Sequence, residues 1–102
     1  MSKKKASRPF SKTSKELLQD PETAAMYLEE ILAEGDIQLF KEALKDVAAA
    51  RVGSMTKLAK QTHLAREALY QSLSRKGNPG LDTLAKVLHA SGLRLSITPE
   101  AA

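Results

Sequence analysis

Residues 54–79 have the sequence SMTKLAKQTHLAREALYQSLSRKGNP, and the rest of the 102-residue chain either supports this stretch or is attached to it. The stretch begins with a short helix pattern capped by Ser54, breaks at residues 62–64, and continues as a second helix pattern over residues 65–74. Two short helices joined by a turn of three or four residues form a helix-turn-helix, whose second helix can lie in the major groove of DNA. The stretch therefore predicts a helix-turn-helix.

The residue spacing within this stretch gives the second helix two different faces. Leu69 and Leu73 lie four residues apart and form its inner stripe, and Ala59 is expected where the two helices cross. The outer face carries Arg66, Glu67, Tyr70 and Gln71. Arginine suits guanine edges, glutamine suits adenine, and glutamate can accept a hydrogen bond from cytosine. A solvated helix is also polar on its outer face, so polarity alone does not establish DNA binding.

The segments LAKQTHLAREALYQSLS (58–74) and KGNPGLDTLAKVLHASGLRLSITP (76–99) resemble the lambda-repressor-like, Xre-type helix-turn-helix domain. More narrowly, they resemble the addiction module antidote proteins, the HigA-like antitoxins, and the upstream segment DPETAAMYLEEILAEGDIQLFKEALKDVAAARVGSM (20–55) fits the same family. The resemblance covers nearly the whole chain apart from its basic beginning.

Two residues depart from the pattern of these families. Their turn usually has Gly at a left-handed position where this chain has His63, and His is among the less penalised residues in that conformation. Their recognition helix often begins with Ser or Thr where this chain has Ala65, which removes an N-cap worth about 1 kcal/mol. Both changes should leave the fold intact.

Length and composition predict one cytoplasmic domain. A chain of 102 residues has room for a single modest core, and four aromatic residues make that core aliphatic. The absence of cysteine excludes disulfides and fits a reducing cytoplasm. No apolar run approaches the roughly 20 residues of a membrane span, and the basic start lacks the apolar region of a secretory signal.

The net charge of +4 is unevenly distributed along the chain. Residues 1–16 hold six Lys/Arg and one acid, giving +5, whereas residues 17–51 hold three Lys/Arg and eight acids, giving −5. Residues 52–102 hold seven Lys/Arg and three acids, giving +4. The helix-turn-helix part is therefore basic, as phosphate binding requires, and the acidic middle suits a second partner.

The chain divides into a disordered basic arm over residues 1–12 and one domain over residues 13–102. The arm either follows DNA phosphates or only adds solubility, and the sequence does not separate these alternatives. Within the domain, residues 13–52 form acidic helices, residues 54–79 the helix-turn-helix with its following loop, and residues 81–98 a last helix and a strand.

Helix boundaries before the central stretch are marked by caps. Asp20 with Pro21 predicts a helix that begins there and extends to about residue 33. Gly35 ends this helix, and Asp36 caps the next one, expected over residues 37–51. A capping box at Thr13–Glu16 also favours a short helix from Ser14 to Gln19.

After the central stretch, residues 81–91 predict the last helix, and residues 93–98 alternate apolar and polar like a strand. A lone strand needs a partner from another chain, and a homodimer joined through Leu93, Leu95 and Ile97 is the simplest solution. Strand addition to a partner protein, or an extended tail packed on the last helix, are the alternatives. The predicted fold is all-α, with five short helices and this C-terminal strand.

Catalytic and metal-binding patterns are missing from the sequence. Neither His63 nor His89 has a second ligand at helical spacing, and no cysteine is present. No serine lies in a Gly-x-Ser-x-Gly setting, and no glycine-rich loop suits a phosphate. Paired carboxylates occur at Glu29, Glu30 and Glu34, but they suit a solvated helix face. We expect a protein that is not an enzyme and has no cofactor.

The favoured function is a sequence-specific transcriptional repressor that binds an inverted-repeat operator in double-stranded DNA as a homodimer. The base-contacting candidates are the four outer-face residues named above. The phosphate-contacting candidates are Thr56, Lys57, Gln61, Ser74, Lys76 and Asn78. Alternatives are a helix-turn-helix regulator without a toxin, or a protein-interaction module that no longer binds DNA.

The family resemblance implies a fuller role. It implies the antitoxin of a type II toxin–antitoxin module, which represses its own operon and neutralises a small RelE/ParE-like toxin. Because such toxins are basic, the acidic middle section is the expected toxin contact, with Glu29, Glu30 and Glu34 as candidates.

Overall fold

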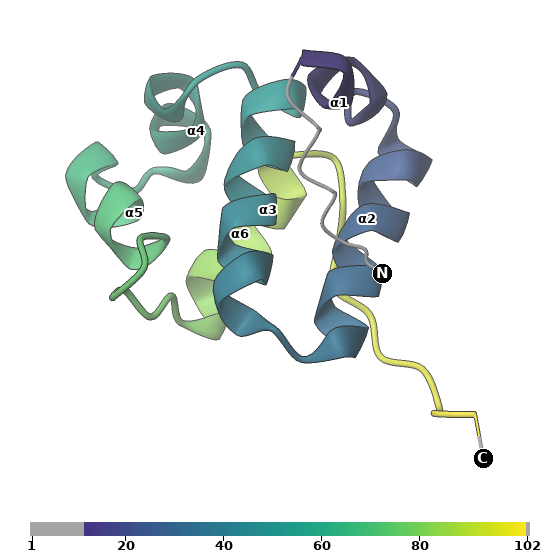
Figure 1. Ribbon diagram of the computed structural model, residues 1–102. Coiled ribbons are helices and arrows are strands. Elements are labelled where there is room, and N and C mark those ends of the chain that lie inside the picture. Colours follow the sequence, from purple (N-terminus) through teal and green to yellow (C-terminus); the bar gives the residue numbers. More distant parts are fainter. Residues whose placement is uncertain (1–11, 102) are drawn as a thin grey trace.

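The computed structural model describes the backbone of residues 12–101 and the side chains of residues 15–101. Within this range the chain forms six α-helices (Figure 1): α1 (Lys12–Leu17), α2 (Pro21–Glu34), α3 (Ile37–Arg51), α4 (Met55–Thr62), α5 (Arg66–Ser72) and α6 (Leu81–Ala90). The basic arm predicted for residues 1–12 lies outside the described residues, except that Lys12 begins α1. None of these helices is long and apolar enough to cross a membrane.

The all-α class is confirmed, but the prediction of five helices with a C-terminal strand is wrong. The segment expected as a minor helix from Ser14 to Gln19 forms α1, which begins two residues earlier and brings the number of helices described to six. Residues 12–101 contain no β-strand. Residues 93–100 have no regular secondary structure, because a strand requires a hydrogen-bonded neighbour and the rest of the described chain forms helices and the turns between them.

This C-terminal segment packs along helices. The Leu93 amide donates to the Leu88 carbonyl of α6 at 2.8 Å, and the Leu93 side chain is half-buried against the core. Beyond it, Leu95 is 43% exposed and Ile97 is 98% exposed. In Figure 1 the segment follows α2 toward the C-terminus. The alternation of apolar residues therefore reflects one half-buried position followed by increasingly exposed ones.

The N-caps predicted for α2, α3 and α4 are confirmed. The Asp20 carboxylate accepts the Thr23 amide at 2.9 Å, and the Asp36 carboxylate accepts the Leu39 amide at 3.0 Å. At the start of α4, the Ser54 hydroxyl accepts the Lys57 amide at 3.1 Å. These side chains satisfy amides that have no partner within the helix.

The cap residue Asp20 also has a lowered pKa. The amide and hydroxyl of Thr23 donate hydrogen bonds to its carboxylate and lower its pKa below the ordinary 3.8. Because the folded pKa is depressed, the cap stabilises the protein above the unfolded pKa, and this stabilisation is lost as pH falls through the folded pKa.

The centre of the molecule is α3, which packs against α1, α2, α4 and α6, while α5 packs on α4 (Figure 1). The core takes one or more aliphatic side chains from each of α3 to α6: Leu44, Val47, Leu58, Leu69 and Val87, each no more than 1% exposed. Burying one such side chain contributes about 1.5–3 kcal/mol. The predicted aliphatic core is therefore present, and it joins the acidic helices to the short helix pair.

Arg51 at the end of α3 connects three parts of the chain. Its Nε donates to the Ser91 carbonyl at 2.5 Å, and its Nη1 donates to the Gln19 carbonyl between α1 and α2. Gly92, at φ +84°, ends α6 beside this guanidinium, and a Cβ there would lie 2.7 Å from Arg51 Nη2. Glycine at this position therefore permits both the left-handed helix end and the close approach of Arg51.

A first prediction concerns the N-terminus of α5. Ala65 has the extended N-cap conformation (φ −67°, ψ 134°) but offers no side-chain hydrogen bond. We expect Ala65→Ser to raise the free energy of unfolding by about 1 kcal/mol, and the melting temperature by roughly 4–8 °C, because the hydroxyl satisfies a free amide. Circular dichroism during thermal unfolding measures this.

The matched control is Ser54→Ala at the start of α4, which removes an observed cap and should lower the melting temperature by a similar amount. If Ala65→Ser leaves the melting temperature unchanged while Ser54→Ala lowers it, the free amides of α5 are satisfied in another way.

Candidate nucleic-acid interface

The connection between α4 and α5 is a tight turn over residues 63–65. His63 ends α4 in the left-handed conformation (φ 60°, ψ 33°), as its position predicted. The next amide, that of Leu64, donates to the Ala59 carbonyl at 3.1 Å, and the Thr62 hydroxyl donates to the Leu58 carbonyl at 2.8 Å. Backbone and side-chain hydrogen bonds therefore satisfy the carbonyls at the end of α4. His63 adopts the left-handed conformation that glycine usually occupies in the resembled families.

The short α5 helix has one buried and one exposed face. Leu69 within the helix and Leu73 directly after it are each 1% exposed and anchor it in the core. All four side chains predicted to contact bases lie on the exposed side: Arg66, Glu67, Tyr70 and Gln71. The structure brings them together on two turns of one helix, which is the arrangement that contact with adjacent base pairs requires.

Tyr70 has a neighbour that the sequence did not indicate. The Lys45 Nζ of α3 lies 5.7 Å from the centroid of the Tyr70 ring, within the range of a cation–π interaction. The ring is nevertheless 57% exposed. Lys45 therefore adds a positive charge beside α5, although it belongs to the acidic middle section of the sequence.

The predicted phosphate-contacting residues lie on both sides of α5. Thr56, Lys57 and Gln61 are exposed on α4. Lys76 and Asn78 are exposed in the loop after α5. Ser74 differs from the others, because it is half-buried and its hydroxyl donates to the Gln71 carbonyl at 2.7 Å. Its hydroxyl is therefore already used in closing the end of α5.

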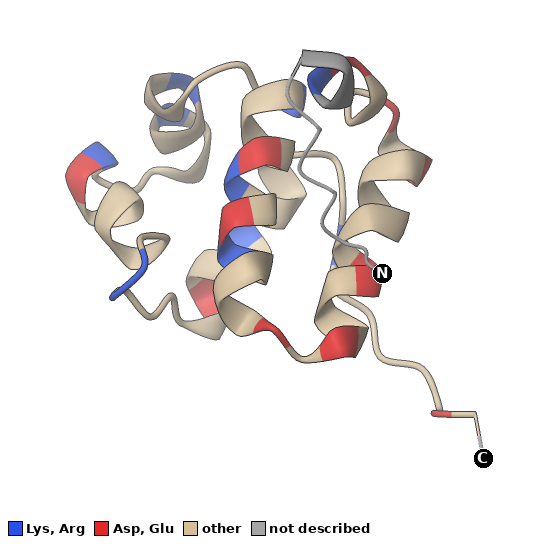
Figure 2. Cartoon of the chain, viewed as in Figure 1, with Lys and Arg blue, Asp and Glu red and all other residues tan. Residues whose placement is uncertain are grey.

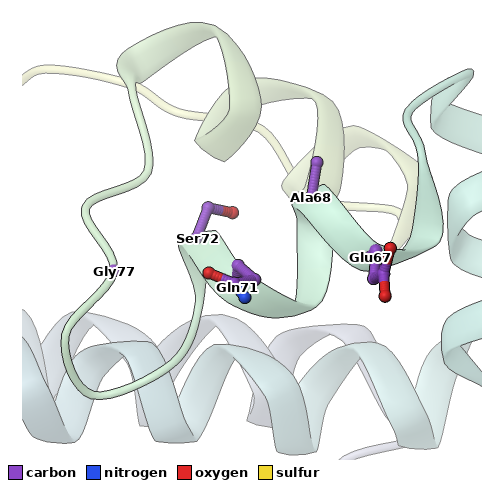
Figure 3. Close-up of a pocket in the computed structure, with 5 residues that line it drawn as sticks. All are labelled: Glu67, Ala68, Gln71, Ser72 and Gly77. Atoms are coloured by element: carbon purple, nitrogen blue, oxygen red, sulfur yellow. The ribbon is translucent and has the colours of Figure 1, made fainter.

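The loop after α5 folds back against the helix and leaves a hollow between them. Glu67, Ala68, Gln71, Ser72 and Gly77 line this hollow, and Figure 3 shows the helix side chains opposite the loop at Gly77. A Cβ at residue 77 would collide with the backbone, meeting the Ser72 carbonyl oxygen at 2.6 Å and the Gln71 oxygen closer still. Only glycine allows this approach, so the loop position depends on it.

Lys41 holds the same loop from the other side. This α3 residue is 4% exposed, and its ammonium donates to three carbonyl oxygens: Ser74 at 3.0 Å, Arg75 at 3.2 Å and Gly77 at 2.6 Å. An ammonium has three donors, so these acceptors use its full capacity. The bonds fix the end of α5 and the loop that carries Lys76 relative to the core.

Sequence analysis missed Lys41 because lysine is seldom buried. A pattern in the sequence was nevertheless available. Lys41 follows Phe40 and lies three residues before Leu44, within the apolar stripe of its helix, where a polar residue needs an internal partner. The partner lies more than thirty residues away in the chain, so only the fold could identify it.

The helix α3 carries opposite charges on different faces. Lys41 and Lys45 lie one turn apart and contact α5 and its loop. Glu42 and Asp46 follow them by one position, about 100° further around the helix, and are exposed. Figure 2 shows both colours on α3 and red segments along α2. The acidic middle of the sequence is therefore divided in space, with its lysines on the side of α5.

Metal binding has little support among residues 12–101, where no group of three or more His, Cys, Asp or Glu side chains could hold an ion. The structure does place His63 and His89 on one hollow between α4 and α6, which Gln61 and Lys86 also line. Lys86 forms an ion pair with Asp82 at 3.2 Å, so the nearby carboxylate is engaged.

The described residues thus form a small all-α protein with a polar surface on a short helix, bordered by lysines. A family model described as "Probable addiction module antidote protein" matches residues 9–99. A protein of Haemophilus influenzae, described as uncharacterized, is 40% identical over 82 residues, which cover 80% of this chain and 82% of that protein. No solved structure matches the chain significantly.

This chain belongs to the probable addiction module antidote protein family. Membership indicates an antitoxin role in a toxin–antitoxin module and suggests a toxin as partner. A member of such a family is not expected to be an enzyme. The resemblance is confirmed at this level, whereas its HigA-like and Xre-type detail stays a prediction.

A second prediction concerns Lys41. We expect Lys41→Met to lower the free energy of unfolding by about 1.5–3 kcal/mol, because the thioether side chain leaves three partly buried carbonyls without their charged donor. Urea denaturation should show a lower midpoint with an unchanged slope. The control is Lys45→Met, one turn further along α3, which should cost only about 0.5–1 kcal/mol. Equal effects of the two substitutions would contradict a special role for Lys41.

Proposed function

We propose that this antitoxin binds DNA through α4 and α5, which act as a helix-turn-helix, and that it represses its own operon. The proposal depends on one observation above all. Four side chains able to contact base edges lie together on the exposed face of α5, and residues on α4 and on the following loop border them. This arrangement matches a helix that enters the major groove while its neighbours contact the backbone.

The individual roles follow from side-chain chemistry. Arg66 and Gln71 can each form paired hydrogen bonds with a base edge, and Glu67 can accept from cytosine. Thr56, Lys57 and Gln61 on α4 contact one strand of phosphates, and Lys76 with Asn78 contacts the other. Ser74 is not proposed as a phosphate contact, because its hydroxyl and its backbone amide both donate to the Gln71 carbonyl.

We also infer that the protein acts as a homodimer on DNA, because one short helix covers only a few base pairs and a two-fold dimer can bind an inverted repeat. A dimer joined through a strand at residues 93–98 is not proposed, because these residues form no strand. Whether the basic N-terminal residues also follow the phosphates concerns residues outside the described part of the chain.

The toxin is proposed to bind the acidic helices, away from α5. Glu29, Glu30 and Glu34 are exposed on α2, and residues 17–40 contain six acids and no Lys or Arg. This surface suits a small basic protein such as a RelE/ParE-like toxin. It would repel DNA, so the two partners are assigned to different faces.

A third prediction tests base contact. We expect Arg66→Ala to lose about 1–3 kcal/mol on the protein's own upstream DNA while changing binding to scrambled DNA little. Lys76→Ala should weaken both and reduce the salt slope by about one. Fluorescence anisotropy at near-physiological salt measures both effects. The control is Arg94→Ala, which removes a positive charge beside α2 and should leave the affinity for DNA unchanged.

The wild-type protein itself should prefer its upstream DNA by at least about a thousandfold over scrambled DNA. Weak, salt-sensitive binding to both would indicate phosphate contact alone and would favour a protein-interaction module. Equal losses on the two DNAs for Arg66→Ala would exclude its role in base contact.

A fourth prediction concerns toxin binding. The triple substitution of Glu29, Glu30 and Glu34 by Gln removes three negative charges from exposed positions on α2. We expect it to slow association with a basic toxin and to weaken the salt dependence of binding, because long-range attraction is reduced. Stopped-flow or biolayer interferometry at two salt concentrations measures this. Association that is unaffected by the substitution would place the toxin elsewhere.

A further inference from the structure

An apolar groove lies between α2 and the C-terminal segment. Its floor is formed by core side chains, Leu28 of α2, Phe40 of α3 and Leu88 of α6, which are buried. Ala25 and Leu32 form the wall on α2, and residues 93–96 form the opposite wall. Helix α2, which forms one wall of the groove, lies on the far side of α3 from α5, the proposed DNA-binding helix (Figure 1).

Two large apolar side chains at this groove remain exposed. Leu32 is 46% exposed on one wall, and Leu95 is 43% exposed on the other. Residues 25, 28, 29 and 32 have the spacing of one helix face, so the exposed leucine continues the buried stripe of α2 outward to the surface. An apolar side chain inserted here would be enclosed by both walls and by the floor.

The charge around the groove limits what can occupy it. Glu29 lies on the α2 wall, and all six charged residues of positions 17–40 are acidic. Arg94 on the opposite wall is the one cation among the residues that line the groove. The α2 side of the groove is therefore acidic, and the side formed by the C-terminal segment carries one positive charge. DNA would be repelled by the acids of α2.

We infer that this groove is the docking site of the basic partner protein, which inserts an apolar side chain between Leu32 and Leu95 and places a cation beside Glu29. The inference rests on the proposed antitoxin function and assigns its toxin-binding surface. An apolar anchor in a pocket, surrounded by a polar rim, is the usual composition of a strong protein contact.

The three glutamates proposed to contact the toxin differ in their positions relative to the groove. Glu30 follows Glu29 by one residue and so projects about 100° away around α2, and Glu34 projects further from the groove wall. Glu29 alone of the three lines the groove. The proposed partner contact therefore depends on Glu29 more than on its neighbours.

The test uses the full-length chain and, as probe, the purified small basic protein encoded next to its gene, with the dissociation constant measured by isothermal titration calorimetry. We expect Leu32→Gln and Leu95→Gln each to weaken binding at least about tenfold. The matched apolar control is Met26→Gln, on α2 but outside the groove and 61% exposed, which should change binding less than about twofold.

Removing the negative and the positive charge of the groove should change the affinity for the basic protein in opposite directions. We expect Glu29→Gln to weaken binding about two- to fivefold and Arg94→Gln to strengthen it by a similar factor, because one removes attraction and the other repulsion. Glu30→Gln serves as the matched charge control, with an effect smaller than that of Glu29→Gln. Helical content and binding to upstream DNA should be unchanged in every variant, which shows that each is folded.

The outcomes separate the two proposals. If the wild-type chain binds the neighbouring protein but Leu32→Gln and Leu95→Gln behave like Met26→Gln, the groove assignment is overturned while the antitoxin function stands. If the wild-type chain does not bind it, or no small basic protein is encoded beside the gene, the antitoxin function fails and this inference fails with it.

Discussion

The contact of the Lys41 ammonium with three backbone carbonyls is the constraint on which the rest of the candidate interface depends. Removing a charged group from water is costly unless its donors are satisfied, so the lysine and the loop must keep their relative positions. The loop is then pressed against α5, where Gly77 leaves no room for a side chain. The exposed face of α5 and the loop with Lys76 are thereby presented as one rigid surface.

The central helix α3 contributes to both proposed functions because its faces differ in charge. Its lysines lie toward α5, where Lys41 fixes the loop and Lys45 lies over Tyr70. Its acids Glu42 and Asp46 are exposed at positions further around the helix. A DNA-binding surface and an acidic surface can therefore coexist within one small domain, separated by a helix whose core residues are buried between them.

The proposed partner site has a different physical basis from the proposed DNA site. On α5, exposed polar side chains are available for hydrogen bonds, and Leu69 is buried in the core. Beside α2, the core itself reaches the surface, because the C-terminal segment covers α2 and α6 only in part and leaves Leu32 and Leu95 exposed. Polar contact suits a nucleic acid, and a partly covered apolar floor suits a protein. The two proposed partners would therefore not compete for the same residues.

The sequence by itself determined the helical fold and most helix ends, because caps at Asp20, Asp36 and Ser54 and the turn at His63 act through neighbouring residues. It also placed the four polar side chains on one face of α5, since helical periodicity is local. Only the tertiary structure decided that residues 93–98 form no strand, because a strand exists through its neighbours. It likewise decided the burial of Lys41 and the groove beside α2, since both join segments that are distant in the chain.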